Sequence, residues 1–181
     1  MKLLLFLAPG FEEIEAVTVI DITRRAGLSI RSVSVTNNKT VTGAHQISVN
    51  ADLLFEEVNF DEIDALILPG GMPGTKNLNA HAGLKKQLVN FAKNPDKTLA
   101  AICAAPSILG ELGLLDGKKA TCYPGFEDQL GRAKLSRKPV VRDGNILTAD
   151  GPAHATLFAL KIVEYLGNSF LASDITKGLN F

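Results

Sequence analysis

The sequence predicts one α/β domain, a three-layer α/β/α sandwich built around a mainly parallel sheet. Two observations carry this prediction. Short apolar runs, typical of strands buried on both faces, recur along the chain, and segments with apolar residues at helical spacing separate them. A length of 181 residues suits a single domain with a full core, and no linker, repeat or low-complexity segment divides residues 1–181.

The first part of the chain has the pattern of a β-α-β unit. Residues 2–8 form a continuous apolar strand that a Pro-Gly pair ends. Helical spacing covers residues 11–26, with glutamates in the first turn, arginines in the last, and Gly27 following as a C-cap. Residues 28–35 alternate like a second strand. Such a unit implies parallel strands joined by a right-handed crossover.

The middle of the chain adds a small hairpin and two further buried strands. Weak alternation over residues 40–49 predicts a hairpin outside the main sheet. An apolar strand at residues 65–68 stops at a Pro-Gly-Gly turn, and a helix follows at about residues 81–92. The next strand, residues 98–102, leads into a short helix that begins at Pro106.

The last third predicts a short strand at residues 120–122, a hairpin that joins residues 140–142 to 146–149, and a closing helix. Strands that alternate with helices over the whole length favour a flavodoxin-like fold. One face of the closing helix, which Gly167 caps, is expected to carry Leu157, Leu160, Val163 and Leu166.

Cys103 lies at the junction between a buried strand and a helix. Its neighbours are small alanines, as a sharp turn that exposes the central side chain requires, so the segment predicts a nucleophile elbow built around cysteine. Pro106 suits the first helical turn, where the free amides of Ala104 and Ala105 are expected to face the sulfur and lower the pKa of the thiol. The alternative is that Cys103 is only a small buried side chain.

Three further residues are expected beside Cys103, because functional groups gather at the carboxyl ends of parallel strands. Glu15 shares a helical stripe with apolar residues and so faces inward, where a carboxylate needs a partner such as the thiol. Gly70 and Gly71 offer uncovered amides that, with Ala104, predict an oxyanion hole. The alternatives are that Glu15 only complements the helix dipole and that Pro-Gly-Gly is an ordinary turn.

Composition limits the partners. Lys and Arg number 19 and Asp and Glu number 19, and no basic run indicates nucleic acid or an acidic membrane. The apolar start is too short for a signal peptide and no stretch is long enough to cross a bilayer, so we expect a cytoplasmic protein with Cys103 and Cys122 reduced. No spacing indicates a metal site, a dinucleotide or a phosphate loop, and Cys122 is expected to be a buried bystander.

Five segments, in order and over essentially the whole chain, resemble the ThiJ/PfpI superfamily and most closely its Parkinsonism-associated DJ-one branch. They are Pro-Gly-Phe-Glu-Glu-Ile-Glu-Ala, Asp-Ile-Thr-Arg-Arg-Ala-Gly, Ile-Leu-Pro-Gly-Gly-Met-Pro-Gly, Ala-Ala-Ile-Cys-Ala-Ala-Pro and Leu-Thr-Ala-Asp-Gly-Pro. Proteins of this branch are described as glyoxalases without cofactor, as deglycases that act on methylglyoxal adducts, and as redox-responsive chaperones. The resemblance therefore implies a small reactive carbonyl or a glycated substrate, and no cofactor.

The resemblance also implies roles for particular residues. Cys103 is the reactive, oxidation-sensitive nucleophile and Glu15 hydrogen-bonds it, while the amides of Gly71 and Ala104 line the anion site. Arg25 falls where the branch has an arginine that reaches the pocket across a homodimer interface, of which the first helix is part. The resemblance thus implies a homodimer.

The sequence departs from the family pattern at four positions. Ala104 stands where the protease-like branch has a histidine, which makes peptidase activity unlikely, and Tyr123 replaces a pocket histidine. His45 and Asp150 replace two arginines, so anion binding is expected to be weaker. His45 is either a pocket acid or base or a solvated hairpin residue, and His154, which follows Pro152, is either a pocket group or the start of a helix.

These residues support three functions. The leading one is a cysteine-dependent conversion of methylglyoxal to lactate through a Cys103 hemithioacetal, with Glu15 relaying the proton. The second is a redox sensor or chaperone whose signal is oxidation of Cys103 to the sulfinate. The third is a cysteine hydrolase of unknown substrate, in which His45 or His154 acts as the base.

Overall fold

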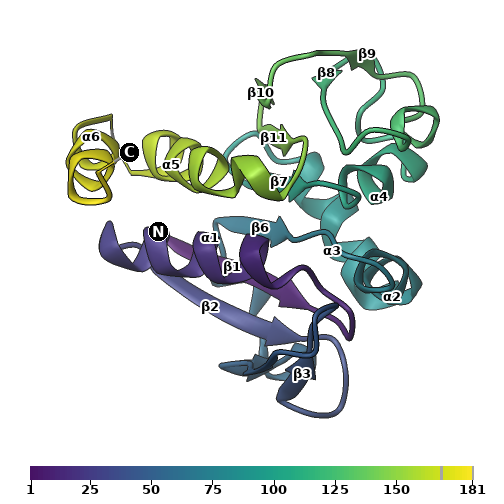
Figure 1. The fold of residues 1–181 in the computed structure, drawn as a ribbon. Coiled ribbons are helices and arrows are strands. Elements are labelled where there is room, and N and C mark those ends of the chain that lie inside the picture. The colour runs from purple at the N-terminus through teal and green to yellow at the C-terminus, as the bar shows by residue number, and fades with distance from the viewer. Residues whose placement is uncertain (168, 181) are drawn as a thin grey trace.

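A computed structural model, which describes residues 1–167 and 169–180, has a seven-stranded sheet at its centre with helices on both faces (Figure 1). The strand order is β10-β11-β7-β6-β1-β2-β5, and every neighbouring pair is parallel except β10 with β11. The strands are β1 Lys2–Leu7, β2 Ser29–Ser34, β5 Leu53–Leu54, β6 Ala65–Leu68, β7 Thr98–Ile102, β10 Val140–Asp143 and β11 Ile146–Ala149. This arrangement confirms the predicted sandwich with a mainly parallel sheet.

Two small sheets lie outside the central one. Strands β3 (Thr40–Thr42) and β4 (Ser48–Asn50) form the predicted antiparallel hairpin. Strands β8 (Lys119–Ala120) and β9 (Lys134–Leu135) pair in parallel, so the strand expected at residues 120–122 in fact begins and ends earlier.

Six α-helices are found in the described residues: α1 Glu13–Arg25, α2 Gly74–Ala80, α3 Ala82–Ala92, α4 Pro106–Glu111, α5 Ala155–Leu166 and α6 Ser169–Gly178. Helices α1, α5 and α6 cover one face of the sheet and α2, α3 and α4 cover the other. Side chains of β1 alternate between these two cores: Leu3, Leu5 and Leu7 enter the first, and Leu4 and Phe6 the second. Within the described residues, no helix is long and apolar enough to cross a membrane.

Two helices were not predicted. In α2, Gly74 and two asparagines are weak helix formers, and the helix packs through the single large apolar residue Leu78, which is fully buried. Helix α6 lies beyond Gly167, the expected cap of the closing helix, and it packs against α5 and the first core. The buried face of α5 also differs from the predicted one, because Leu157 is half-buried and Phe158 fully buried.

The order of the central strands decides where the site lies. Strand β6 pairs with β1 on one side and with β7 on the other, so the carboxyl ends of these three strands are adjacent. Helix α1 follows β1, the Gly70-Gly71 turn follows β6, and Cys103 follows β7. The predicted convergence at this edge of the sheet is therefore confirmed.

Candidate active site around Cys103

Cys103 has the backbone of an elbow. Its φ angle is +64°, in the left-handed region that costs a side chain with a Cβ energy. The strained turn is held from two sides: the Cys103 N–H donates to the carbonyl of Ala149 at 2.9 Å, and its carbonyl accepts the N–H of Tyr123 at 2.8 Å. Strand β7 ends at Ile102 and α4 begins at Pro106, as the elbow prediction requires.

The sulfur is nearly enclosed. Cys103 is 9% exposed, and the backbone N–H groups of Gly71 and Ala104 hydrogen-bond the sulfur and act to lower its pKa. The expectation for Ala105 is wrong, because its N–H donates to the carbonyl of Ile102 at 3.0 Å. Two amides therefore face the sulfur: that of Ala104 from the elbow and that of Gly71 from the turn after β6.

Glu15 is the acid of the site. It is fully buried on α1, and its Oε2 accepts the N–H of Gly70 at 2.7 Å. Within the described residues, its Oε1 accepts no hydrogen bond of regular geometry. The Cys103 thiol lies next to the carboxyl group, and the negative charge and hydrogen bonding of Glu15 both affect the pKa of the thiol. The inward orientation predicted from the helical stripe is confirmed.

Burial dominates the titration of this pair. It raises the pKa of Glu15 to about 7, an effect that the Gly70 N–H and the thiol oppose and the nearby Glu12 charge reinforces. Burial, followed by the charge of Glu15, raises the pKa of Cys103 to about 12 against the two amides. The expected lowering of the thiol pKa is therefore wrong, since the amides of Gly71 and Ala104 do not outweigh removal from water and the charge of Glu15, and α4 is only six residues long.

The two pKa values describe one coupled pair, because each group feels the charge of the other. Above a pH of about 7 the pair has lost one proton, and the second remains until about 12. Over that range the order of the two values places the negative charge on Glu15 and the remaining proton on Cys103. A thiolate forms when that proton passes from the sulfur to the carboxylate.

The Gly70-Gly71 turn is built to fit closely against Cys103 and α1. A Cβ at Gly70 would lie 2.6 Å from Cys103 Cβ and 3.0 Å from both Cys103 Sγ and Glu15 Oε2. Gly71 has φ +88°, and a Cβ there would lie 2.4 Å from the Glu12 nitrogen. Because the Gly70 N–H is taken by Glu15, Gly70 positions the acid and does not serve as the predicted anion donor.

Replacement of Gly70 by alanine is expected to lower the free energy of unfolding by about 1–3 kcal/mol, because the added methyl overpacks the thiol and the carboxyl. Denaturant unfolding measures the change. Gly178→Ala is the control, because a Cβ there meets nothing within 4 Å and its expected effect is within about 1 kcal/mol. Equal stability of the two variants would contradict the described packing.

The other residues predicted near the pocket lie on segments that border the elbow. Tyr123 is 44% exposed, and its ring lies 3.1 Å from the position of a Cβ on Gly151. His154 Nδ1 is 2.6 Å from Asp150 Oδ1, close beyond the end of β11. Cys122 is buried, and burial raises the pKa of its thiol to about 11.

Arg25 does not lie with these residues. It ends α1 and forms an exposed ion pair with Asp21, Nε to Oδ2 at 2.8 Å. Ten residues of helix separate it from Glu15, which corresponds to about 15 Å. Within one chain Arg25 is therefore outside the site, and its predicted role depends on a second copy.

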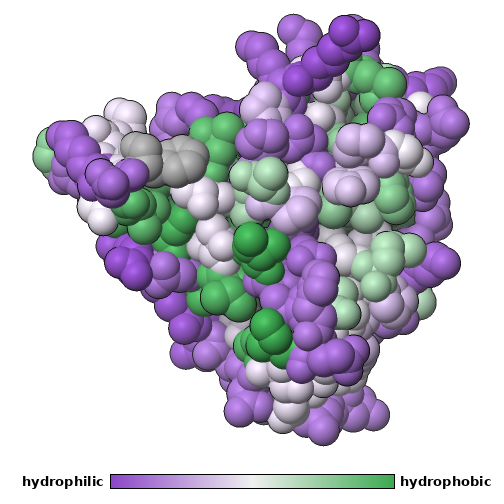
Figure 2. Space-filling model, in the orientation of Figure 1, coloured by the Kyte–Doolittle hydropathy of each residue, from purple (hydrophilic) through white to green (hydrophobic). Residues whose placement is uncertain are grey.

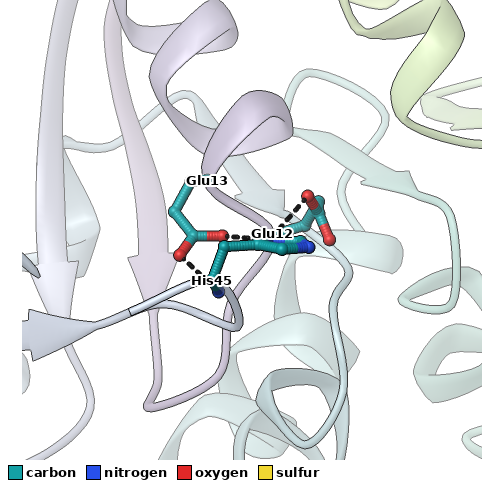
Figure 3. Close-up of side chains that lie close together, drawn as sticks. All are labelled: Glu12, Glu13 and His45. Carbon is teal, nitrogen blue, oxygen red and sulfur yellow. Dashed lines mark hydrogen bonds and ion pairs between the residues drawn. The ribbon is translucent and has the colours of Figure 1, made fainter. Parts of the chain in front are cut away.

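His45 lies in the loop between β3 and β4, where it contacts the beginning of α1 (Figure 3). Its Nδ1 is 2.9 Å from Glu13 Oε2 and 3.5 Å from Glu12 Oε1, and these carboxylates raise the pKa of its imidazole. Burial raises the pKa of Glu13, but hydrogen bonds from His45 and the loop backbone outweigh it, so the net pKa is lowered. The sequence did not indicate this cluster, because His45 and Glu13 are 32 residues apart.

His45 and His154, the two candidate bases for hydrolase chemistry, thus each lie within hydrogen-bond distance of a carboxylate. In the part of the chain that the structure describes, neither the His45 nor the His154 ring hydrogen-bonds Cys103. This placement gives the hydrolase hypothesis no support.

The fold and the elbow define a class of protein: an α/β sandwich with a cysteine on a strained turn at the carboxyl end of a parallel sheet, beside a buried carboxyl. The chain belongs to the DJ-1/PfpI family, whose model matches residues 1–165. The family resemblance seen in the sequence is confirmed.

Individual relatives agree over nearly the full length. Protein dj-1beta of Drosophila melanogaster is 35% identical over 97% of this chain and 95% of its own, and a deglycase of Pyrococcus abyssi is 35% identical over 92% of this chain and 99% of its own. Among solved structures, the oxidized form of Toxoplasma gondii DJ-1 has a TM-score of 0.94 and 38% identity, over 99% of this chain and 98% of that one. These relatives support a DJ-1-like enzyme or stress protein.

Proposed function

We propose that the protein is a cysteine-dependent, cofactor-independent enzyme that acts on small reactive carbonyls and converts methylglyoxal to lactate. One observation carries the proposal: the Cys103 sulfur lies between the amides of Gly71 and Ala104 and the buried carboxyl of Glu15. A nucleophile, donors for a developing oxyanion and a proton carrier thus meet at one point.

The reaction oxidises the aldehyde carbon of methylglyoxal, reduces the neighbouring keto carbon and consumes one water molecule, so no external oxidant is required. A sulfur electron pair forms a C–S bond to the aldehyde carbon, the amides of Gly71 and Ala104 stabilise the oxyanion, and Glu15 protonates it. Glu15 then removes the hydrogen on that carbon as a proton, which gives an enediol, and returns it to the neighbouring keto carbon. The hydroxyl proton on the first carbon passes to the former keto oxygen, which yields a lactoyl thioester. Water attacks the thioester, the C–S bond breaks, and the sulfur leaves as thiolate.

The proton relay can be followed in D₂O. Reduced protein with methylglyoxal, a chelator and no added thiol is expected to produce lactate that carries deuterium at C2, because the Glu15 proton exchanges with solvent during the enediol step. Proton NMR of the product measures it. Absence of lactate from fully reduced protein would overturn the proposal. Because the archaeal relatives are named deglycases, glycated substrates should be tested in the same way.

The second candidate is a redox sensor or stress-response chaperone. The same two amides that face the sulfur are donors for a sulfinate oxygen, and one structural neighbour was solved in an oxidized form. Both cysteines are free, which suits a reducing cytoplasm. Mild peroxide that oxidises Cys103 and creates reversible protection of client proteins, with negligible turnover of glyoxals, would favour this function.

The proposed active form is a homodimer in which α1 faces its copy. Ile14, Val17 and Ile47 are each about half exposed, at 53%, 47% and 57%, and Figure 2 shows hydrophobic side chains gathered over α1 and the neighbouring hairpin. Sedimentation is expected to give a dimer for the wild type and a monomer for Val17→Asp. A wild-type monomer would remove Arg25 from the site.

A further inference from the structure

Three side chains of metal-ligating type converge at the beginning of α1, apart from the sulfur. Glu12 and Glu13 come from the turn into the helix, and His45 comes from the β3–β4 loop (Figure 3). One donor atom of each lies within 4.8 Å of the others. Two elements that are distant in sequence thus supply a mixed set of one imidazole and two carboxylates.

The spacing of the donor atoms suits a small divalent cation. His45 Nδ1 is 2.9 Å from Glu13 Oε2 and 3.5 Å from Glu12 Oε1. With bonds of about 2.0–2.1 Å, ligand atoms around a tetrahedral zinc lie about 3.3 Å apart. These two distances fall on either side of that value, and the donor atoms of the two carboxylates lie within 4.8 Å of each other.

Glu13 is oriented as a ligand before any ion binds. Its side chain is only 8% exposed, and its Oε1 accepts the N–H of His45 at 2.7 Å and that of Ile47 at 3.3 Å. These bonds fix the carboxylate and direct Oε2 toward the imidazole, as outer hydrogen bonds do for metal-bound carboxylates. Gly43 permits this, because a Cβ there would lie 2.3 Å from Glu13 Cδ.

Charge and access are also suitable. Among the described ion pairs, Glu12 and Glu13 have no Lys or Arg partner, and the exposed imidazole of His45 is the only basic side chain paired with the two carboxylates. His45 is 67% exposed, and the same three residues line a shallow surface groove with Ile14, Val17, Thr18 and Ile47. In the single chain a cation can therefore enter from solvent and neutralise buried negative charge.

We propose that Glu12, Glu13 and His45 form a binding site for a first-row divalent transition-metal ion, zinc above all. The imidazole is the reason for this class, because Mg²⁺ and Ca²⁺ prefer all-oxygen ligands. Three protein ligands leave one position of the tetrahedron to water. The proposal does not rest on the function proposed for Cys103.

The test uses Cys103→Ser/Cys122→Ser protein, so that thiols contribute no binding, and titrates it with Zn²⁺ in a calorimeter. One equivalent per chain is expected, and His45→Gln should weaken binding at least about tenfold because a ligand is lost. His154→Gln, which alters the other carboxylate-paired histidine, is the control and should leave affinity unchanged. Because His45 is exposed, its substitution leaves the core intact, and circular dichroism checks this.

A second measurement reads the ligand directly. With ¹⁵N-labelled histidine, one equivalent of Zn²⁺ should shift the Nδ1 resonance of His45 and not those of His81 and His154. Equal affinity of wild type and His45→Gln would overturn the proposal. So would equal competition by Mg²⁺ or Ca²⁺, which would show an unspecific acidic surface.

Discussion

Cys103→Ser is expected to reduce the conversion of methylglyoxal to lactate by roughly 10³-fold or more, the scale seen when a catalytic nucleophile is removed. The reason is the ionised Glu15 carboxylate. Above a pH of about 7 that carboxylate can accept the thiol proton as the sulfur attacks, whereas a serine hydroxyl at the same elbow is a far weaker acid and nucleophile. The measurement is lactate formed per enzyme under first-order conditions.

Cys122→Ser is the matched control. Cys122 is also a buried cysteine, at 7% exposed against 9% for Cys103. Among the described residues no carboxyl group hydrogen-bonds its thiol, and burial raises the pKa of that thiol to about 11. Its replacement is expected to leave activity within about twofold, since its thiol takes no part in the reaction. If both variants stay fully active, Cys103 is not the nucleophile.

Glu15→Gln is expected to stabilise the folded protein at pH 8 and to have little effect at pH 4. The pKa of Glu15 in the folded protein, about 7, exceeds the ordinary glutamate pKa of 4.5, so the folded state binds the proton more tightly than the unfolded state. Stability therefore falls as pH rises from 4.5 to 7 and then levels off. The shift corresponds to about 3 kcal/mol, and glutamine removes this loss while its Oε1 still accepts the Gly70 N–H.

Denaturant unfolding of both proteins at pH 4, 6 and 8 measures this effect. Glu56→Gln, at an exposed site, is the control and should change stability equally at every pH. The same Glu15→Gln protein should lose most of its lactate formation, because glutamine cannot carry the proton between the two carbons. A stabilising effect that is constant with pH would show that Glu15 is not held protonated by burial.

The sequence predicted the elements that carry strong periodicity or turn chemistry. The strand before Cys103, the helix that carries Glu15 inward and the glycine turn at Gly70 all follow from apolar spacing and from Pro and Gly positions. Helix α2 was missed because its composition opposes a helix and the packing of Leu78 decides it. Helix α6 was not predicted because Gly167 indicated the end of the last helix.

Part of the site could not be predicted from local sequence patterns. Spacing placed Glu15 and Cys103 together, but the sign of the thiol pKa shift depends on how completely the fold excludes water, which no local pattern records. The Gly70 amide was read as free, whereas a side chain 55 residues away takes it. The contact of Glu13 with His45 also depends on tertiary structure, since the hairpin loop returns to the helix only in the folded chain.

The most direct test of the account is to identify the covalent intermediate. Reduced wild-type protein is mixed with methylglyoxal, quenched with acid at short intervals and mapped by peptide mass spectrometry. One methylglyoxal equivalent is expected on Cys103, forming and decaying as fast as lactate appears, with none on Cys122. Continued lactate production with Cys103 unmodified at every time point, or after Cys103 has been alkylated, would contradict it.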